Sequence, residues 1–456
     1  MKSISTLFTL LLGTGWIAAF AQPADSSKTE FSLKDAWEYA LENNADAKNA
    51  AIDIQIGKHR IMENIALGLP QVTGAVDYNY NIAPPVFIFP NIAGPNPNPN
   101  EFITIDAAPL NTMTASAQIS TLLVSGQYFI GIQTAKTFLE LTKQQKEKTD
   151  IDVKEQIIKA YYLVLIAEES KRVIDSSLRV IERTVYETEQ IYESGLIEEL
   201  DVEQLQLVLF TTQDAAAQIN RSYDVAMYSL KFQMGYPFDK PIHLTDGLES
   251  LIESSQYEQV IGSLGDKMDV KSNIDYRLIT QKMAIDNYQV KLQRASAYPT
   301  LSTFLSVSGN FFNNERWLFL GNGTTSTLGG VIWGVSLRVP IFSSWNRVSK
   351  LKQLKLEVVK DRNLQYSTEQ GLNVSYQNNK NQLIDYYQRY LTTKKNYELA
   401  NKIRNVNRIK FTEGLISSID LTQAETQFFD AQQRYFQAIF DLLNAKIQVD
   451  KLLNQF

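Results

Sequence analysis

Proline and glycine are almost absent from two stretches of this sequence, each longer than 100 residues. Residues 110–236 and 341–456 contain no proline, although the chain of 456 residues has 13. Gly195 is the only glycine over 132–234, and only two glycines occur over 341–456. A compact α/β enzyme needs turn residues every ~10–20 positions. Both stretches therefore predict very long helices and argue against that class of enzyme.

Several classes of function are excluded by what the sequence lacks. It has no cysteine, which excludes disulfides, thiolate metal sites, cysteine nucleophiles and a lipid-modified N-terminal cysteine. Its two histidines, His59 and His243, lack HExxH-type spacing, and there is no GxxxxGK[ST] phosphate-binding loop. A net charge of −6 gives no reason to expect nucleic acid as a partner. Because acidic residues nowhere cluster with a base or a nucleophile, we expect no enzyme, no catalytic or metal-binding residues and no cofactor.

Residues 1–21 have the pattern of a secretory signal peptide. Lys2 supplies the positive charge, an apolar run follows, and Ala19-Phe20-Ala21 fits the small-x-small cleavage pattern. An N-terminal membrane anchor is the alternative, but a Gly-Thr-Gly interruption leaves the run short for a span of about 20 residues. No later stretch is apolar enough for a transmembrane helix, so we expect any membrane crossing to use strands.

The two halves of the chain share one order of predicted elements: helix, strand, strand, long helix, turn, helix. The motif GLIEELD at 195–201 aligns with GLISSID at 414–420. The first repeat, 22–272, is expected to contain a helix over 31–68, strands over 72–82 and 113–122, a long helix over 126–192, a helix over 200–234 and an irregular segment over 236–272. The second repeat, 273–456, is expected to contain a helix over 273–297, strands over 301–311 and 330–339, a long helix over 345–412 and a helix over 419–454.

Two local signals refine this order. Ser32, with Asp35 three residues later, is the expected N-cap of the first helix. Seven of the 13 prolines lie between Pro84 and Pro109, so the stretch 83–111 is expected to be a long loop, neither helix nor central strand.

The predicted strands alternate between an apolar and a polar face over about the length of a membrane-spanning strand. Four strands cannot close a barrel, and an open edge is not tolerated in lipid, so chains must share the barrel. The expected fold is an α+β membrane protein in which a long α-helical barrel is continuous with a transmembrane β-barrel shared between subunits. Two alternatives stay open: β-hairpins in a soluble sandwich, and a coiled-coil stalk without a lumen.

The signal peptide, the duplicated order of elements and the GLxxxxD turns resemble TolC-like outer-membrane efflux proteins. The resemblance covers about 31–455. It implies a homotrimer with a twelve-stranded β-barrel in the outer membrane and a helical barrel that projects into the periplasm. It also implies passive export of substrates that an inner-membrane pump and a periplasmic adaptor deliver. The alternative is a periplasmic coiled-coil adaptor or scaffold without a pore.

The resemblance also implies roles for individual residues. The turns between long and short helices would form the periplasmic tip that meets the adaptor, with Gly195, Leu196, Ile197, Gly414, Leu415 and Ile416 as candidates. The candidate channel constriction comprises Asp420, Asp201 and Gln423. At Gln423 this chain departs from the best-known members, which carry a second Asp there.

Each of these candidates also has a plainer role. Asp201 and Asp420 could simply cap helices. Gly195 and Gly414 need no role beyond a left-handed helix end.

Candidates for an aromatic girdle at the lipid boundary are Trp317, Trp333, Tyr78 and Tyr80. The loops 83–111 and 313–328 are expected to face the exterior.

Overall fold

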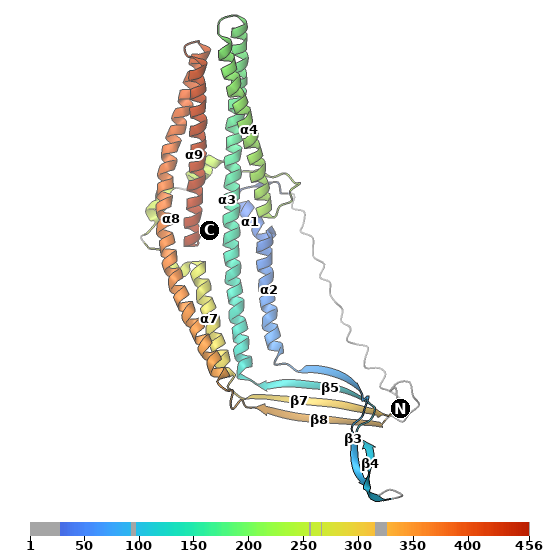
Figure 1. Cartoon of the computed structure of the whole chain (residues 1–456). Coiled ribbons are helices and arrows are strands. Elements are labelled where there is room, and N and C mark those ends of the chain that lie inside the picture. The colour runs from blue at the N-terminus through green and yellow to red at the C-terminus, as the bar shows by residue number, and fades with distance from the viewer. Residues whose placement is uncertain (1–27, 93–96, 255–256, 266, 315–325, 456) are drawn as a thin grey trace.

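The molecule consists of long helices and a small sheet at one end of them. The computed structural model describes residues 28–92, 97–254, 257–265, 267–314 and 326–455. Figure 1 shows the helices side by side, with the strands of the sheet running off to one side at their lower end. Within the described residues, no helix combines the length and the apolar character needed to cross a membrane.

Two helices run nearly the whole length of the helical part. α3 (Gly126–Glu193) has 68 residues and α8 (Asn346–Thr412) has 67, which corresponds to about 100 Å at 1.5 Å per residue. Each continues through a tight turn into a returning helix of 36 residues, α4 (Glu199–Met234) or α9 (Ser418–Leu453). The expected long helices are present within a residue or two of their predicted bounds.

In each repeat, a shorter helix packs along the rest of the long helix. α2 (Ala45–Ala66) packs along the part of α3 that α4 does not reach, and α7 (Ile274–Ala295) does the same for α8. An asparagine at the N-cap of each shorter helix joins it to the returning helix. Asn44 Nδ2 donates to the carbonyl oxygen of Gln233 at 2.7 Å, and Asn273 Nδ2 donates to that of Leu452 at 3.1 Å. The same junction therefore occurs once in each repeat.

The helix expected over 31–68 is in fact two helices, α1 (Leu33–Asn43) and α2. Asn44 divides them, because its extended backbone ends α1 while its side chain accepts hydrogen bonds from the backbone of Asp46 and Ala47. The N-cap expected for the first helix is correct: Ser32 and Asp35 form a capping box.

Four strands form one antiparallel sheet in the order β2-β5-β7-β8. The strands are β2 (Gln71–Tyr80), β5 (Asn111–Val124), β7 (Thr300–Asn313) and β8 (Ser326–Arg338). All four pair in continuous register, with one irregularity near the end of β5. The two hairpins expected from the repeats thus join into a single sheet, with β2 and β8 at its edges.

The stretch expected to be a long loop contains two strands instead, which is a correction to the sequence interpretation. β3 (Val86–Asn91) and β4 (Asn98–Asp106) pair as a separate two-stranded ribbon that extends away from the end of the sheet in Figure 1. Proline is tolerated there because both strands are edges, and the register shifts directly after Pro90. The prediction that no central strand occurs here is correct.

The segment 236–272 packs against the middle of the helices. It contains β6 (His243–Leu244), α5 (Leu248–Ser254), α6 (Tyr257–Ser263) and a short 3₁₀ turn, η1 (Val270–Ser272), and β6 pairs with β1 (Glu30–Phe31). The hydroxyl of Tyr161 lies within hydrogen-bond distance of the Phe31 carbonyl and of Asp246, and Leu33 N–H donates to the same carboxylate. The predicted irregular segment is thus an ordered part of the largest hydrophobic core.

Glu155 on α3 holds α9 in place through charge, which gives a testable prediction. Lys159 and Lys451 and the Gln448 amide donate to its carboxylate at 2.5, 2.6 and 2.8 Å. Burial alone would raise the pKa of Glu155, but these hydrogen bonds outweigh it and lower the pKa from 4.5 to about 2. A lowered pKa means stability that is present above pH 4.5 and is lost as the pH falls toward 2.

We expect Glu155→Gln to lower the free energy of unfolding by about 2 kcal/mol near neutral pH and to flatten its decline in acid. Circular dichroism melting of the purified protein across this pH range measures both effects. Glu140→Gln, on the same helix in an exposed pair with Lys143, is the control and should change stability by less than about 0.5 kcal/mol. Equal acid sensitivity in the Glu155 variant and the wild type would contradict the assignment.

Candidate functional site

The sheet has two unlike faces, and the pairing register aligns each face across all four strands. On one face Val72, Ile119, Leu305 and Trp333 form a row. A second row on this face consists of Tyr78, Met113, Phe311 and Thr327. The large side chains that the edge strands contribute to these rows, Val72, Tyr78 and Trp333, are exposed. Among the residues that the structure describes, the apolar surface of these edge strands is therefore left uncovered.

The opposite face of the sheet is largely polar. One row consists of Thr73, Gln118, Ser306 and Ile332, and another of Asp77, Thr114, Asn310 and Leu328. Thr114 Oγ1 donates to Asn310 Oδ1 at 2.8 Å within the second row. Polar residues thus dominate this face on three strands, whereas β8 contributes apolar residues to both rows. A sheet of this kind can separate an apolar from an aqueous medium.

The predicted girdle residues lie at different levels of the sheet. Tyr78 and Tyr80 lie at the end of β2 farthest from the helices, and the Tyr78 hydroxyl donates to Asn111 Oδ1 at 2.6 Å. Trp333 lies in the interior of β8, level with Leu305. Trp317 lies outside the described residues. The structure therefore places the two tyrosines at one level and Trp333 nearer the helices.

At the opposite end of the molecule, both helix turns have the same backbone. Gly195 and Gly414 adopt left-handed conformations, with φ of 74° and 70°. Leu196 N–H donates to the carbonyl of Ile191 and Leu415 N–H to that of Lys410, as in a Schellman motif. The motif leaves the two leucines outermost, with 77% and 67% of their surfaces exposed. Ile197 and Ile416 follow them and are partly buried.

A direct contact joins the two turns to each other. The hydroxyl of Ser418 donates to the carboxylate of Asp201, and the side-chain oxygen of Gln204 lies 2.7 Å from the same hydroxyl oxygen. Ser418 is buried. Asp201 is not the N-cap of α4, because Glu198 occupies that position without a side-chain bond. Asp201 therefore links the first repeat to the second.

The other two constriction candidates lie on the exposed side of α9. Asp420 is the third residue of a capping box, in which its Oδ2 accepts hydrogen bonds from the backbone and the hydroxyl of Ser417 at 3.1 and 2.8 Å. Gln423 is exposed three residues later, whereas Leu421 and Ala424 face the core. The structure thus places Asp420 and Gln423 on one helix face, directed away from the chain's own packing and apart from Asp201.

A buried ionic cluster lies next to the turns. Glu425 is only 3% exposed, and its carboxylate lies 3.1 Å from Arg408 Nε and 3.9 Å from Arg404 Nη1. Arg404 also donates to Ser177 Oγ on α3 at 3.0 Å and stacks over the ring of Phe428. Burial raises the pKa of Glu425, and the two guanidinium groups oppose that change. The cluster ties α8, α9 and α3 together with two cations and one anion.

Sequence reasoning missed this cluster and the Ser418 contact. One signal was available for the cluster, because Glu425 interrupts the buried face of α9 formed by Leu421, Ala424 and Phe428. A charged residue in such a position needs a buried partner. Nothing in the sequence pairs Ser418 with Asp201, which lies 217 residues away.

Comparison with known proteins agrees with this geometry. A family model described as outer membrane efflux protein matches residues 37–236 and 280–455. The chain is 22% identical to the outer membrane protein TolC of Vibrio cholerae over 98% of this chain and 94% of that protein. It is 21% identical to the proteases secretion protein PrtF of Dickeya chrysanthemi over 73% of this chain and 68% of that protein.

A solved structure shares the fold along almost the entire chain. A crystal structure of CusC, from work on the conformational changes that accompany its folding and transmembrane channel formation, superposes with a TM-score of 0.68. The match covers 95% of each chain at 14% identity. At this identity the likeness concerns the fold alone.

The turn glycines allow a prediction with a matched control. Nothing lies within 4 Å of a Cβ added to either Gly414 or Gly371, so a new methyl group meets no clash at either position. Only Gly414 has a positive φ. We expect Gly414→Ala to destabilise the protein by about 1 kcal/mol, and Gly371→Ala, inside α8, to stabilise it by about 0.5–1 kcal/mol. Thermal unfolding of both variants measures the difference, and shifts of the same sign would refute the conformational role of Gly414.

Proposed function

Because the chain belongs to the outer membrane efflux protein family, we propose that three copies share one closed β-barrel in the outer membrane. As a member of this family, it is an exit duct for efflux or secretion, and it conducts its substrates without a catalytic step. In this proposal the long helices of the three copies continue the barrel as a tube into the periplasm. The transported substrate is set by the pump that the duct serves.

The observation that carries the shared barrel is the four-stranded sheet with two unlike faces and two edges, β2 and β8. Backbone groups on an open edge cannot be satisfied in lipid, and the smallest closed barrels have about eight strands. Pairing β8 of one copy with β2 of the next removes both edges of the four-stranded sheet. It also turns the apolar rows toward lipid and the largely polar rows toward a water-filled lumen. An adaptor or scaffold without a pore would have no use for this division.

The helical part supports the same arrangement of copies. Helix contacts follow the order α2, α3, α7, α8, so α2 and α8 lie at the two sides of each copy. Both expose large apolar side chains: Ile52, Ile56 and Met62 on α2, and Leu356 and Val359 on α8. Two different apolar surfaces on one chain suit a head-to-tail ring, in which each copy contacts the next.

A periplasmic adaptor and an inner-membrane pump are the proposed partners. One proposed contact is the tip, where Leu196 and Leu415 are exposed beside Gly195 and Gly414. A second is a groove of about 470 Å³ between α3, α4 and α9, lined among others by Ile166, Ile219, Phe429, Phe436 and Phe440. An amphipathic helix of a partner can lie in a groove of this kind.

The tip is also the proposed place of closure. Ser418 and Asp201 join the two helical hairpins of one copy, which restrains them from separating. Asp420 and Gln423 point away from the copy's own core. With three copies around the channel axis, Asp420 would supply one ring of carboxylates and Gln423 a neutral ring beside it.

We expect the purified protein to run as a heat-modifiable trimer and to form channels in planar bilayers. Ser418→Ala should raise the single-channel conductance, because it removes a hydrogen bond that joins the two hairpins near their turns. Ser222→Ala, which removes a hydroxyl that donates to the Gln218 carbonyl within α4, is the control and should leave conductance unchanged. Release from cells without detergent as a monomer would overturn the proposed function.

Block of the channel by divalent cations tests the proposed ring of Asp420 carboxylates separately. Asp420→Ala should weaken block by a divalent cation at the periplasmic side, whereas Gln423→Asp should strengthen it at least about tenfold by adding a second ring of carboxylates. Titration of the channel current with magnesium measures both. Unchanged block in both variants would dismiss these residues as the constriction while leaving the duct itself intact.

A further inference from the structure

The loop between β8 and α8 exposes a compact apolar cluster. Ile341, Phe342 and Trp345 are 90%, 80% and 73% exposed. The cluster continues the apolar face of β8, since Val331, Trp333, Val335, Leu337 and Val339 alternate along the strand and Ile341 comes next in the series. The apolar surface of the sheet therefore extends past its last strand residue to the beginning of the helix.

The backbone of this loop is held in an unusual conformation. Ser344 and Trp345 are consecutive non-glycine residues with φ of 45° and 70°, in the left-handed region that residues other than glycine rarely adopt. Trp345 occupies the N-cap position of α8 and makes no side-chain capping bond. Tryptophan is favoured neither as an N-cap nor at positive φ, so local helix geometry does not account for this residue.

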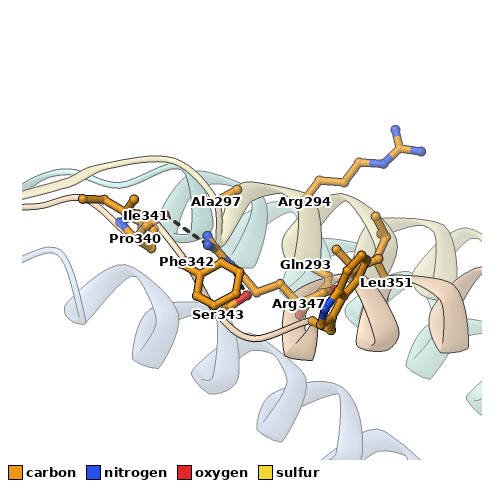
Figure 2. A pocket seen from close by; sticks show the side chains of 11 residues that line it. Gln293, Arg294, Ala297, Pro340, Ile341, Phe342, Ser343, Arg347 and Leu351 are labelled. Atoms are coloured by element: carbon orange, nitrogen blue, oxygen red, sulfur yellow. Dashed lines mark hydrogen bonds between the residues drawn. The ribbon is translucent and has the colours of Figure 1, made fainter.

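Arg347 keeps the loop in this shape. Its guanidinium donates to the carbonyl of Pro340 at 3.0 Å and to Ser343 Oγ at 3.1 Å, and a longer bond of 3.5 Å reaches the carbonyl of Ser296. Gln293 on α7 donates to the carbonyl of Arg347 at 3.4 Å. A loop braced in this way carries the exposed rings of Phe342 and Trp345. Figure 2 shows Phe342 beside Arg347 in this loop.

The loop borders an open pocket of about 570 Å³. Its apolar lining includes Ile341, Phe342, Trp345 and Leu351, and its charged residues are two arginines, Arg294 and Arg347, with no acid. The Arg294 side chain extends from α7 into open space (Figure 2). An apolar surface with a cationic rim is complementary to a lipid whose acyl chains adjoin a phosphate.

We propose that this pocket binds a phospholipid of the membrane leaflet nearest the helices. Its acyl chains would lie on Ile341 and Phe342, Trp345 would lie at the boundary between chains and headgroups, and Arg294 would reach the phosphate. Tryptophan is enriched at this boundary in membrane proteins. The inference rests on the proposed membrane placement of the sheet. A second copy would contact the edge of β8 and the exposed side of α8, whereas the cluster continues the apolar face of the sheet.

Tryptophan fluorescence tests the proposal with an internal reference. One variant carries Trp16→Phe, Trp37→Phe, Trp317→Phe and Trp333→Phe and keeps Trp345. A second carries Trp16→Phe, Trp37→Phe, Trp317→Phe and Trp345→Phe and keeps Trp333. Both are reconstituted as trimers in vesicles of brominated phosphatidylcholine, with bromine either near the glycerol backbone or near the methyl end of the chains. We expect shallow bromine to quench Trp345 more strongly and deep bromine to quench Trp333 more strongly.

A comparison of two lipid headgroups tests the role of Arg294. At equal bromine density, Trp345 should be quenched about fivefold more effectively by brominated phosphatidylglycerol than by the phosphatidylcholine analogue. Arg294→Gln should abolish that preference while depth-dependent quenching remains. If Arg294→Gln left the preference for phosphatidylglycerol unchanged, the proposed contact between Arg294 and the lipid phosphate would be wrong.

The reference residue separates the two possible failures. Quenching of Trp333 without quenching of Trp345 would mean that another copy covers the cluster, and it would overturn the lipid site while leaving the membrane placement intact. Absence of quenching at both residues would overturn the membrane placement itself, and the proposed function with it. Heat-modifiable mobility and circular dichroism establish that each variant is folded.

Discussion

The end-to-end junction between two short helices is the interaction on which this architecture depends. A helix of about 100 Å has a packing face that must be covered along its whole length, and a returning helix of 36 residues covers about half of it. The N-cap amides of Asn44 and Asn273 bond to the last turn of the returning helices and make each pair one continuous partner. Because α2 and α7 both have 22 residues, each continuous partner extends equally far from its junction toward the strands.

Different kinds of interaction hold the two ends of the molecule together. The sheet is held mainly by backbone hydrogen bonds, and most side chains of its edge strands β2 and β8 are exposed. The opposite end is held by side chains: the hydroxyl of Ser418 on Asp201, and Glu425 between two arginines. Membership in the outer membrane efflux protein family, expected from the duplicated elements, is confirmed by the match over both repeats.

Much of this fold could be predicted, because helices without proline and strands of period two are local patterns. The failures also have local causes. Asn44 lies within an otherwise helical pattern, and only its capping bonds reveal the break. The β3–β4 ribbon was concealed by its prolines, which an isolated pair of edge strands accommodates. The two helix turns were located from the repeated GLxxxxD motif, but the contact between Asp201 and Ser418 and the positive φ of Trp345 depend on distant contacts and backbone shape that no local pattern encodes.

The cluster of Arg404, Arg408 and Glu425 has a mechanical consequence. Apolar helix surfaces can slide past each other by small steps, because a methyl group that leaves one apolar neighbour meets another and the packing energy changes little. Helices joined by a carboxylate buried between two guanidinium groups cannot slide in this way. A shift of one residue along the helix axis would leave the buried carboxylate without a partner in a medium of low dielectric constant. Axial sliding between α9 and α8 is therefore blocked at this level. Movement of this end of the molecule is restricted to pivoting about the cluster, with the register of the two helices preserved.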